Sequence, residues 1–378
     1  MKQQVAITKA YHEARLHKRW KLNTSQFSFK EERFCRLLIQ QLRTKTYQIK
    51  SSLCFIAFSP VKREIFAGDF LDRVIHHLLF NQLNPQYDKL LIHDCYSCRE
   101  HKGTSFGIKR AAHFMQKVSS NYKKKAFVLK LDIKGYFMNI DRSLLYQQNK
   151  QIITQLYAHR PAEQNELLYL LKQVIFNDPT KNCRLRGHKL DWRGLPKNKS
   201  LFASKPGKGL PIGNLTSQLF GNLYLNQFDH FVKRKLKCKY YGRYVDDMIF
   251  FHEDKEYLKK IIPQVRNYLH TNLGLEIHEK KIYLQPVSYG LKFLGAIIKP
   301  GRIYPGPRLI KGFHHCLSQA AHGKADINQV NSYLGLLKQF RSFKLRKKYL
   351  NSRLGQAALK AIKAKVNEDY SKLKLYIK

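Results

Sequence analysis

The stretch Tyr240-Tyr-Gly-Arg-Tyr-Val-Asp-Asp-Met-Ile-Phe-Phe251 decides the fold of this chain. Two strand-like segments flank Asp246 and Asp247, and the pattern predicts a β-hairpin with both aspartates at its tip. Turns and strand ends are places where functional carboxylates reach solvent and ligands. A bare aspartate pair is also a common polar turn, so other segments must decide between these two interpretations.

A third carboxylate, Asp132, closes another strand pattern. Phe127, Leu129 and Leu131 alternate with other residues, which is typical of a strand with one buried face and predicts that Asp132 emerges at its end. Three carboxylates packed together in a basic chain repel one another unless cations offset them, and hard oxygen ligands suit Mg²⁺. Two such ions roughly 4 Å apart can activate an attacking 3′-hydroxyl and stabilise a leaving pyrophosphate.

The composition predicts the kind of partner. Lys and Arg number 70 against 26 Asp and Glu, which gives a formal net charge of +44. This charge exceeds what solubility requires, so we expect a polyanion bound in a salt-dependent manner, with a merely solvated basic surface as the weaker alternative. With 43% hydrophobic and 12% aromatic residues, the 378 residues can bury a sizeable core, ordinarily in two or three domains.

The sequence also argues against several classes of protein. Apolar runs such as Leu167-Leu-Tyr-Leu-Leu171 are too short to span a bilayer, and the N-terminus has no apolar stretch that would serve as a signal sequence. We therefore expect a cytoplasmic location and no membrane partner. Seven cysteines, an odd number, favour reduced thiols over a disulfide framework.

One cysteine-rich segment needs weighing as a zinc site. His93, Cys95, Cys98 and His101 have spacings that could ligate zinc. Structural zinc sites usually draw two ligands from a distant second segment, and four ligands within so short a stretch leave little loop to fold around a metal. A coincidence of composition is the favoured interpretation.

Periodicity predicts the elements around the two strand patterns. Apolar residues at helical spacing indicate a helix over residues 69–80, and Asn214 is a suitable cap for a helix that follows it. Residues 182–208 are polar and contain Pro and Gly, which predicts a loop or short strands. Residues 301–378 are expected to be mostly helical. Near the N-terminus, a solvated helix face and an RNA contact are equally plausible roles for five basic residues: Lys9, Arg15, Lys18, Arg19 and Lys21.

Taken in order, seven segments resemble the motifs of reverse transcriptases. Four resemble the palm: Phe127-Val-Leu-Lys-Leu-Asp-Ile-Lys-Gly-Tyr-Phe137, Gly209-Leu-Pro-Ile-Gly-Asn-Leu-Thr-Ser-Gln218, Tyr244-Val-Asp-Asp247 and Gly290-Leu-Lys-Phe-Leu-Gly295. Three resemble the fingers of bacterial members: Lys62-Arg-Glu-Ile65, Asp72-Arg-Val-Ile75 and Tyr96-Ser-Cys-Arg-Glu-His-Lys-Gly103. The resemblance covers roughly residues 50–340.

The resemblance implies an α+β fold shaped as a right hand, with fingers, a palm of antiparallel sheet backed by helices, and a short helical thumb. The expected division has four parts: a basic helical segment over residues 1–50, fingers over 51–126, a palm over 127–300 with a fingers-side insertion at about 142–208, and a helical thumb with a basic C-terminal segment over 301–378.

The segment Leu210-Pro-Ile-Gly-Asn-Leu-Thr-Ser-Gln218 carries the subfamily signal. Most reverse transcriptases have Gln where this chain has Ile212, and Pro where it has Gln218. The form found here looks like the group II-like reverse transcriptases of diversity-generating retroelements, which copy a template RNA into cDNA with errors at adenines and so diversify a target gene. Isoleucine offers only apolar contact where glutamine could hydrogen-bond, which would relax discrimination of the nascent pair. The alternative, that Ile212 simply packs, stays open.

The resemblance also implies roles for individual residues. Asp132, Asp246 and, less directly, Asp247 would position two Mg²⁺ ions, with the Ile133 carbonyl as a further ligand. Phe137 matches the steric gate that crowds a ribose 2′-hydroxyl and so favours deoxynucleotides.

Several basic residues match positions that bind the incoming nucleotide. Arg63 matches the fingers arginine that clamps the triphosphate, because a guanidinium suits bidentate phosphate contact. Lys280 or Lys281 is expected near the triphosphate. Arg73 and Arg99 are weaker candidates, since either could instead pair with a carboxylate or with the template backbone.

These implications describe an error-prone RNA-directed DNA polymerase that uses Mg²⁺ and dNTPs. Its implied partners are a structured template RNA, the RNA/cDNA duplex and a small basic accessory protein. Two alternatives remain: a retron-like or phage-defence reverse transcriptase, and a non-catalytic RNA-binding or splicing-assistance protein on the same fold. The intact carboxylates Asp132, Asp246 and Asp247 argue against the second alternative.

Overall fold

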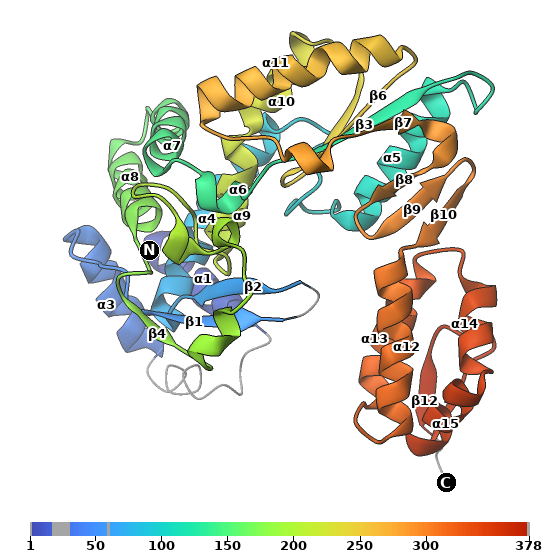
Figure 1. Ribbon diagram of the computed structural model, residues 1–378. Coiled ribbons are helices and arrows are strands. Elements are labelled where there is room, and N and C mark those ends of the chain that lie inside the picture. The colour runs from blue at the N-terminus through green and yellow to red at the C-terminus, as the bar shows by residue number, and fades with distance from the viewer. Residues whose placement is uncertain (1, 17–30, 59–60, 376–378) are drawn as a thin grey trace.

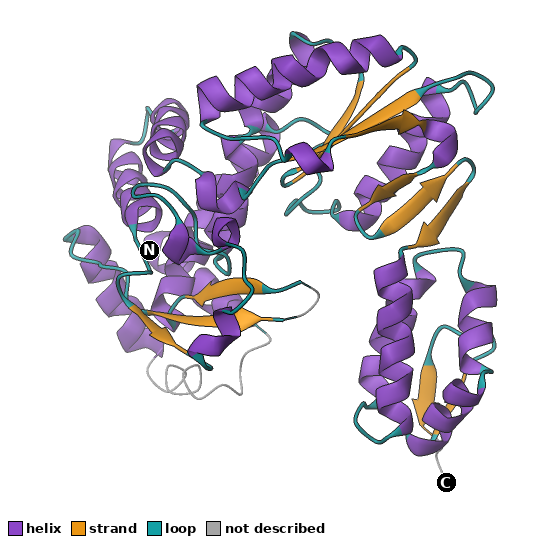
Figure 2. Ribbon diagram, viewed as in Figure 1, coloured by secondary structure: helices purple, strands orange, loops and turns teal. Residues whose placement is uncertain are grey.

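The computed structural model describes residues 2–16, 31–58 and 61–375, so Lys18, Arg19 and Lys21 lie outside the described residues. The chain follows an open arc, with a helix-rich N-terminal part at one end, a four-stranded sheet at the top and a C-terminal helical unit at the other end (Figure 1). Helices and short sheets alternate along this arc (Figure 2). The fold is therefore α+β, as the sequence predicts.

The sheet that carries the carboxylates has the strand order β5-β6-β3-β7, with every pair of neighbours antiparallel. Its strands are β3 (Phe127–Asp132), β5 (Tyr240–Tyr244), β6 (Asp247–His252) and β7 (Tyr283–Pro286). The predicted hairpin and the predicted strand ending at Asp132 are both confirmed. The register sets Asp132 directly across from Asp247.

Helices cover both faces of this sheet, and the expectation of a single buried face for β3 is wrong. Val128 is as deeply buried as Leu129 and Leu131. Val128 packs in a cluster with residues of α5 (Thr104–Val118), whereas Leu129 and Leu131 pack in the main core with α10 (Asn226–Arg234) and α11 (Lys255–Leu273). Because each face must bury against a helix layer, apolar side chains point both ways.

A second sheet, with the order β2-β1-β4, lies in the N-terminal part of the arc (Figure 1). β1 (Ser52–Ala57) and β2 (Arg63–Ala67) are antiparallel, and β4 (Cys183–Leu185) joins β1 in parallel. Three 3₁₀ turns follow β4: η1 (Lys189–Trp192), η2 (Lys197–Lys199) and η3 (Leu201–Ala203). This arrangement confirms the predicted loop and short strands over residues 182–208.

The remaining helices among the described residues of this half are α1 (Lys2–Arg15), α3 (Glu31–Arg43), α4 (Phe70–Leu90), α6 (Tyr136–Asn139), α7 (Arg142–Leu156), α8 (Pro161–Phe176) and α9 (Leu215–Tyr224). Asp69 caps α4, because its carboxylate accepts a backbone N–H of the first turn at 3.2 Å. The helix continues to Leu90, well past the predicted end at Phe80, since buried apolar residues continue along it. Asn214 occupies the N-cap position of α9, but its side chain makes no capping hydrogen bond.

After two 3₁₀ turns, η4 (Glu279–Lys281) and η5 (Val287–Tyr289), the chain forms a third sheet from β8 (Leu291–Phe293), β9 (Ala296–Lys299) and β10 (Arg302–Pro305). The C-terminal unit then contains α12 (Pro307–Ala321), α13 (Ile327–Lys338), α14 (Phe343–Leu350), α15 (Arg353–Ala361), β11 (Ala364–Val366) and β12 (Leu373–Leu375). The region after residue 300 is thus mostly helical, as predicted, with strands at both of its ends. Its core residues, from Phe313 to Leu373, form a cluster of their own.

Candidate active site

The turn between β5 and β6 places two of the three carboxylates. Val245 and Asp246 form this two-residue turn, and Tyr244 pairs with Asp247 across the hairpin. Val245 has a φ of +54°, in the left-handed region that tight hairpin turns use. Asp132 lies across from Asp247 in the neighbouring strand. Strand pairing therefore gathers at one end of the sheet three carboxylates that are distant in sequence.

The charges of these carboxylates act on one another. Burial raises the pKa of Asp246 from 3.8 to about 7, and the negative charges of Asp247 and then Asp132 add to the rise. Lys281 opposes it more weakly. A carboxyl with so high a pKa resists ionisation beside two other carboxylates. The metal-free site therefore favours either a proton or an added cation.

Two lysines partner the other two carboxylates. Lys281 Nζ lies 3.0 Å from both Asp132 carboxylate oxygens, and Lys130 Nζ lies 3.0 Å from Asp247 Oδ1. Of the pair Lys280 and Lys281, it is Lys281 that reaches the site. Sequence reasoning missed Lys130, although a lysine two residues before Asp132 in an otherwise apolar strand lies on the same face as that aspartate.

The side-chain donors at this end of the sheet determine whether it suits a divalent cation. Within residues 2–16, 31–58 and 61–375, no three His, Cys, Asp or Glu side chains converge closely enough to hold a metal ion, and two of the carboxylates are engaged by lysines. The donors still fit a hard cation, because all are carboxylate oxygens and because burial, together with the charges of Asp247 and Asp132, raises the pKa of Asp246. Asp132, Asp246 and Asp247 are the side chains that would hold it.

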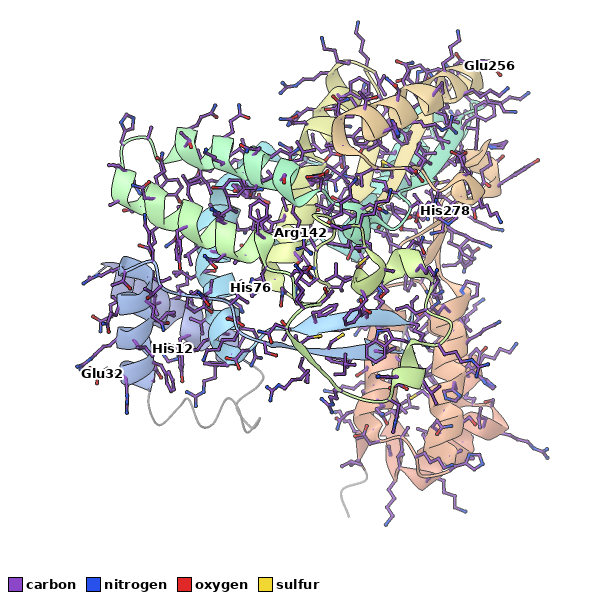
Figure 3. All side chains as sticks on the ribbon, turned by 60° about the vertical axis from the view of Figure 1, so that its left-hand side comes forward. His12, Glu32, His76, Arg142, Glu256 and His278 are labelled. Atoms are coloured by element: carbon purple, nitrogen blue, oxygen red, sulfur yellow. The ribbon has the colours of Figure 1, made fainter. Side chains whose placement is uncertain are left out.

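The backbone beside Asp132 is fixed by the segment that follows α11. The N–H of His278, a residue labelled in Figure 3, donates to the Asp132 carbonyl at 2.8 Å, and the Lys134 N–H donates to the Glu276 carbonyl at 2.8 Å. Ile133 lies between these two hydrogen bonds, and its carbonyl is the acceptor in neither of them. That placement is compatible with the predicted use of the Ile133 carbonyl as a ligand.

Phe137 and Ile212 lie against the same small apolar cluster, although they belong to separate motifs. The buried members of the cluster are Cys54, Phe66, Met138 and Leu201. The Ile212 carbonyl accepts the Phe66 N–H at 2.8 Å, which ties this segment to β2. The next residue, Gly213, has a φ of +128°, and a Cβ there would lie 2.6 Å from the Phe66 carbonyl oxygen, so only glycine fits. The structure therefore places Phe137 and Ile212 against one apolar cluster.

Arg63 lies near the carboxylate hairpin. It is exposed at the start of β2, the strand to which Ile212 is bonded. Burial and the neighbouring Cys98 raise the pKa of the Tyr244 hydroxyl, and the positive charge of Arg63 acts in the opposite direction. Arg63 is therefore within electrostatic range of the residue that precedes the turn.

Arg99 pairs with a carboxylate, which is one of the alternatives that the sequence leaves open. Its guanidinium is bound to Asp88, with Nε 2.5 Å from Asp88 Oδ1, and it also donates to the carbonyls of Ile92 and Cys95. The placement of Arg99 as a nucleotide-binding residue is thereby corrected, because a buried guanidinium with these partners has no donor left for a phosphate. Arg73 stacks over Phe70 at 5.4 Å, and burial lowers the pKa of its guanidinium.

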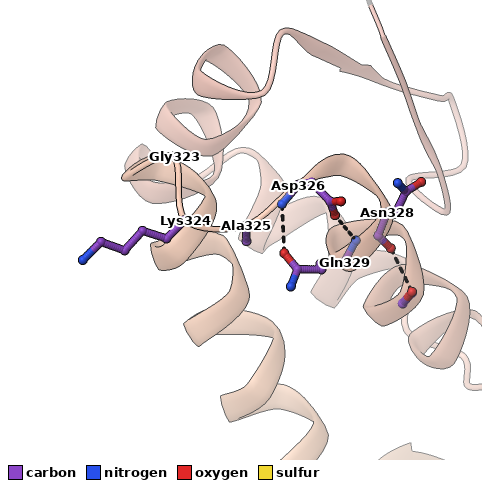
Figure 4. A pocket seen from close by; sticks show the side chains of 7 residues that line it. Gly323, Lys324, Ala325, Asp326, Asn328 and Gln329 are labelled. Atoms are coloured by element: carbon purple, nitrogen blue, oxygen red, sulfur yellow. Dashed lines mark hydrogen bonds between the residues drawn. The ribbon is translucent and has the colours of Figure 1, made fainter. Parts of the chain in front are cut away.

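Two other regions, the segment with Cys95 and Cys98 and a surface pocket on the C-terminal unit, are separate from the carboxylate site. Cys95 Sγ donates to Asn222 Oδ1 at 3.6 Å, and Cys98 Sγ donates to Gln218 Oε1 at 3.0 Å. The two cysteines of the possible zinc segment therefore have separate hydrogen-bond partners. An open surface pocket of about 480 Å³ lies at the start of α13, where Asp326 and Gln329 exchange capping hydrogen bonds (Figure 4). It belongs to the C-terminal unit and contains none of the carboxylates above.

Two solved telomerase structures resemble this chain at low sequence identity. Among the described helices, none combines the length and apolar character needed to cross a bilayer. No curated protein matches the chain. Telomerase from Candida albicans, solved with a TWJ fragment of telomeric RNA, resembles it at 13% identity and a TM-score of 0.46, over 83% of this chain and 61% of that one. Apo telomerase from Candida tropicalis resembles it at 11% identity and a TM-score of 0.45, over 86% and 63%.

The chain thus spans about six tenths of the telomerase chains it resembles. The family described as "Reverse transcriptase (RNA-dependent DNA polymerase)" matches residues 62–298, which include the carboxylate hairpin, Asp132, Arg63, Phe137 and Ile212. The match covers well over half of the 378 residues, and the predicted polymerase fold is confirmed with it. The chain belongs to the reverse transcriptase family.

Proposed function

We propose that this protein is an RNA-directed DNA polymerase that extends a primer with dNTPs along an RNA template. The observation that carries the proposal is the placement of Asp132, Asp246 and Asp247 at one end of the sheet, where burial and then the charges of the other two carboxylates raise the pKa of Asp246. Reverse transcriptases generally use divalent metal ions, and we propose Mg²⁺ here. Two bound ions would lower the barrier to attack by the primer 3′-hydroxyl and to departure of pyrophosphate.

Each remaining side chain of the site has a proposed task. Arg63 would bind the triphosphate, since its guanidinium is exposed on β2 near the hairpin. Phe137 would crowd the 2′ position of the sugar. Its ring packs against both the main core and the cluster around Phe66, so that it would not easily move aside for a hydroxyl.

The right-hand division is part of this proposal. Fingers over residues 51–126, a palm over 127–300 and a thumb over 301–378 would surround the template and primer. The pairing of β4 with β1 supports a fingers-side insertion within residues 142–208. The segment before residue 51 would add basic surface to the fingers.

We further propose that the enzyme copies adenines inaccurately and serves a diversity-generating retroelement. Ile212 supports this, because it occupies the position where most members of the family have glutamine and, like Phe137, it packs against the apolar cluster. An apolar side chain there cannot hydrogen-bond around the nascent pair. The difference in binding free energy between a correct and an incorrect base pair is therefore smaller. A small basic accessory protein and a structured template RNA would complete the system, and a net charge of +44 supports the RNA partner.

Primer extension on a defined RNA template with Mg²⁺ and dNTPs tests the proposal, with the cDNA sequenced. Wild type should make cDNA with errors concentrated opposite template adenines, Ile212→Gln should lower that error rate, and Ile212→Leu, the apolar control, should keep it. Asp246→Ala should make no cDNA while still binding RNA.

The other outcomes separate the rival functions. Accurate cDNA from wild type and from Ile212→Gln would retain the polymerase and replace diversification by a retron-like or defence role. If wild type made no cDNA and Asp246→Ala kept the biological activity, the protein would be an RNA-binding or splicing-assistance factor.

A further inference from the structure

The turn that presents Asp246 contains a strained residue. Val245 is β-branched, and its φ of +54° lies in a region that such residues rarely adopt. A conformation of this kind is strained and persists only where the surroundings enforce it. The neighbours of Val245 must therefore supply that enforcement.

Two side chains hold the Val245 peptide groups. Arg243 Nη1 donates to the Val245 carbonyl at 2.9 Å, and the Val245 N–H donates to Ser97 Oγ at 3.3 Å. Arg243 belongs to β5, whereas Ser97 belongs to the loop before α5. The backbone on both sides of the strained φ is thus clamped by side chains from two separate segments.

Both clamps are themselves fixed by buried partners. Arg243 and Asp229 are fully buried and form a two-point ion pair, with contacts of 2.8 Å and 2.6 Å. Arg243 Nη2 also donates to the Asn222 carbonyl at 3.1 Å. The Ser97 hydroxyl donates to Asn222 Oδ1 at 2.6 Å, and Asn222 Nδ2 returns a bond to the Ser97 carbonyl at 2.6 Å. The network joins α9, α10, β5 and the loop that carries Ser97.

Stability alone is a poor reason for this network, because a buried ion pair often contributes little against well-packed apolar side chains. Its geometry points instead to the turn, since the network ends on the two peptide groups that flank the Val245 side chain. We propose that Ser97, Asn222, Asp229 and Arg243 are positioning residues, which hold Val245 in the left-handed conformation and thereby aim Asp246 at the cation site. This inference rests on the proposed polymerase function and deepens it.

Ser97→Ala is the sharpest test, because a matched control exists. It removes a hydroxyl that donates to the buried Asn222 Oδ1. Tyr87→Phe likewise removes a hydroxyl that donates to a buried asparagine oxygen, Asn149 Oδ1, at 2.7 Å, but in the packing of α4 against α7. Both variants lose one buried hydrogen bond, and Ser97→Ala alone also loses the acceptor for the Val245 N–H.

Mn²⁺ is the probe, with its affinity read by electron paramagnetic resonance of the full-length protein, beside thermal unfolding and primer-extension kinetics. Ser97→Ala should weaken Mn²⁺ binding about tenfold, which corresponds to about 1.4 kcal/mol, and should lower kcat more than it raises KM. Tyr87→Phe should show a comparable fall in Tm with Mn²⁺ affinity unchanged. Arg243→Lys keeps the charge opposite Asp229 but lacks the donor to Val245, so it should also weaken Mn²⁺ binding.

A double mutant supplies the second readout. Glycine adopts a positive φ at little steric cost, so a Val245→Gly turn needs less enforcement, and adding Ser97→Ala to it should change Mn²⁺ affinity by less than twofold. Equal Mn²⁺ affinity in wild type, Ser97→Ala and Arg243→Lys would overturn the positioning role and leave the polymerase proposal intact. If Asp246→Asn bound Mn²⁺ as tightly as wild type, the ion would bind away from Asp246. That result would overturn both the positioning role and the polymerase proposal.

Discussion

At the scale of single residues, the site opposes the stability of the metal-free protein. Asp246 is held near two other carboxylates by strand register and by the tight hairpin turn. Burial and those charges raise its pKa to about 7, whereas an unfolded chain would leave it near its ordinary value. Folding therefore places this carboxyl where its ionised form is disfavoured, until a cation or a proton offsets the charge.

Replacing Asp246 by Asn should stabilise the protein when metal is chelated. Because the folded pKa of Asp246 is raised, its ionisation destabilises the fold fully above about pH 7, and this effect disappears as pH falls towards 4. Asp246→Asn should raise the free energy of unfolding by about 1–3 kcal/mol at pH 8, after discounting for partial exposure. Urea unfolding at pH 8 and at pH 4.5 measures this difference. An equal stabilisation at both pH values would contradict the electrostatic cause.

Lys281 competes with a cation for Asp132, and its removal should tighten metal binding. Its Nζ lies 3.0 Å from both oxygens of that carboxylate. Lys281→Met should therefore lower the Mn²⁺ dissociation constant by roughly threefold to tenfold, since an opposing charge near the site contributes on the order of 1 kcal/mol. Lys280→Met removes the same formal charge from the adjacent residue and is the control, with a change below twofold. Matching effects of the two variants would mean that overall charge matters and the contact does not.

The residues that sequence reasoning found and missed differ in the range of their contacts. Asp132, Asp246 and Asp247 follow local strand patterns, so their meeting could be predicted. Arg99 takes one of the two roles left open for it, a pair with a carboxylate. The choice could not be predicted, because its pairing with Asp88 depends on how a loop returns to α4. The partners of Arg243 are Asp229 and Asn222, which lie on two helices and carry no local signal of pairing. Single-sequence patterns do not encode such contacts.

At the scale of elements, the segment after β4 is fastened to the strand that carries Arg63. Glu64 is 1% exposed on β2, and its carboxylate accepts three hydrogen bonds, from Trp192 Nε1 at 2.7 Å, Ser200 Oγ at 2.8 Å and the Leu201 N–H at 2.6 Å. Leu201 in turn belongs to the apolar cluster beneath Phe137 and Ile212. A segment that the sequence predicts as a loop or short strands thus closes the cluster on one side, and long-range hydrogen bonds to one carboxylate position it.

Replacing Glu64 by Ala should release this segment. Three donors would lose their acceptor inside the protein, which should lower the free energy of unfolding by about 3 kcal/mol or more. Trypsin should then cleave faster at Lys197 and Lys199, which lie in η2. Glu276→Ala is the control, because Glu276 is exposed and forms a surface ion pair with Lys134. Unchanged cleavage between residues 192 and 201 would show that other contacts hold the segment.

At the scale of the whole molecule, the C-terminal unit is built as a separate body. Its apolar core runs from Phe313 to Leu373 and is distinct from the two cores that enclose the carboxylate sheet. The link between them runs through β10 (Figure 1), and Phe340 packs against the second core. Basic residues spread over both bodies contribute to the charge of +44, so a polyanion lying along the arc could contact both.

Removal of residues 307–378 should weaken duplex binding while leaving metal binding at the carboxylate site intact. The remaining chain keeps both cores that enclose the carboxylate sheet, so its Mn²⁺ affinity should stay within threefold of wild type. Its affinity for an RNA/DNA duplex should fall at least tenfold, and the salt dependence of binding should flatten, because fewer counterions are released when fewer phosphates are contacted. In primer extension, single-nucleotide addition should persist at saturating duplex while long products disappear.

Phe340→Ala in the full-length chain is the milder companion to this deletion, because it loosens the contact with the second core and keeps every basic residue. It should shorten products with little change in the salt dependence of duplex binding. If the deletion abolished Mn²⁺ binding, or if product length were unaffected, the C-terminal unit would have to support the carboxylate sheet itself rather than hold the duplex.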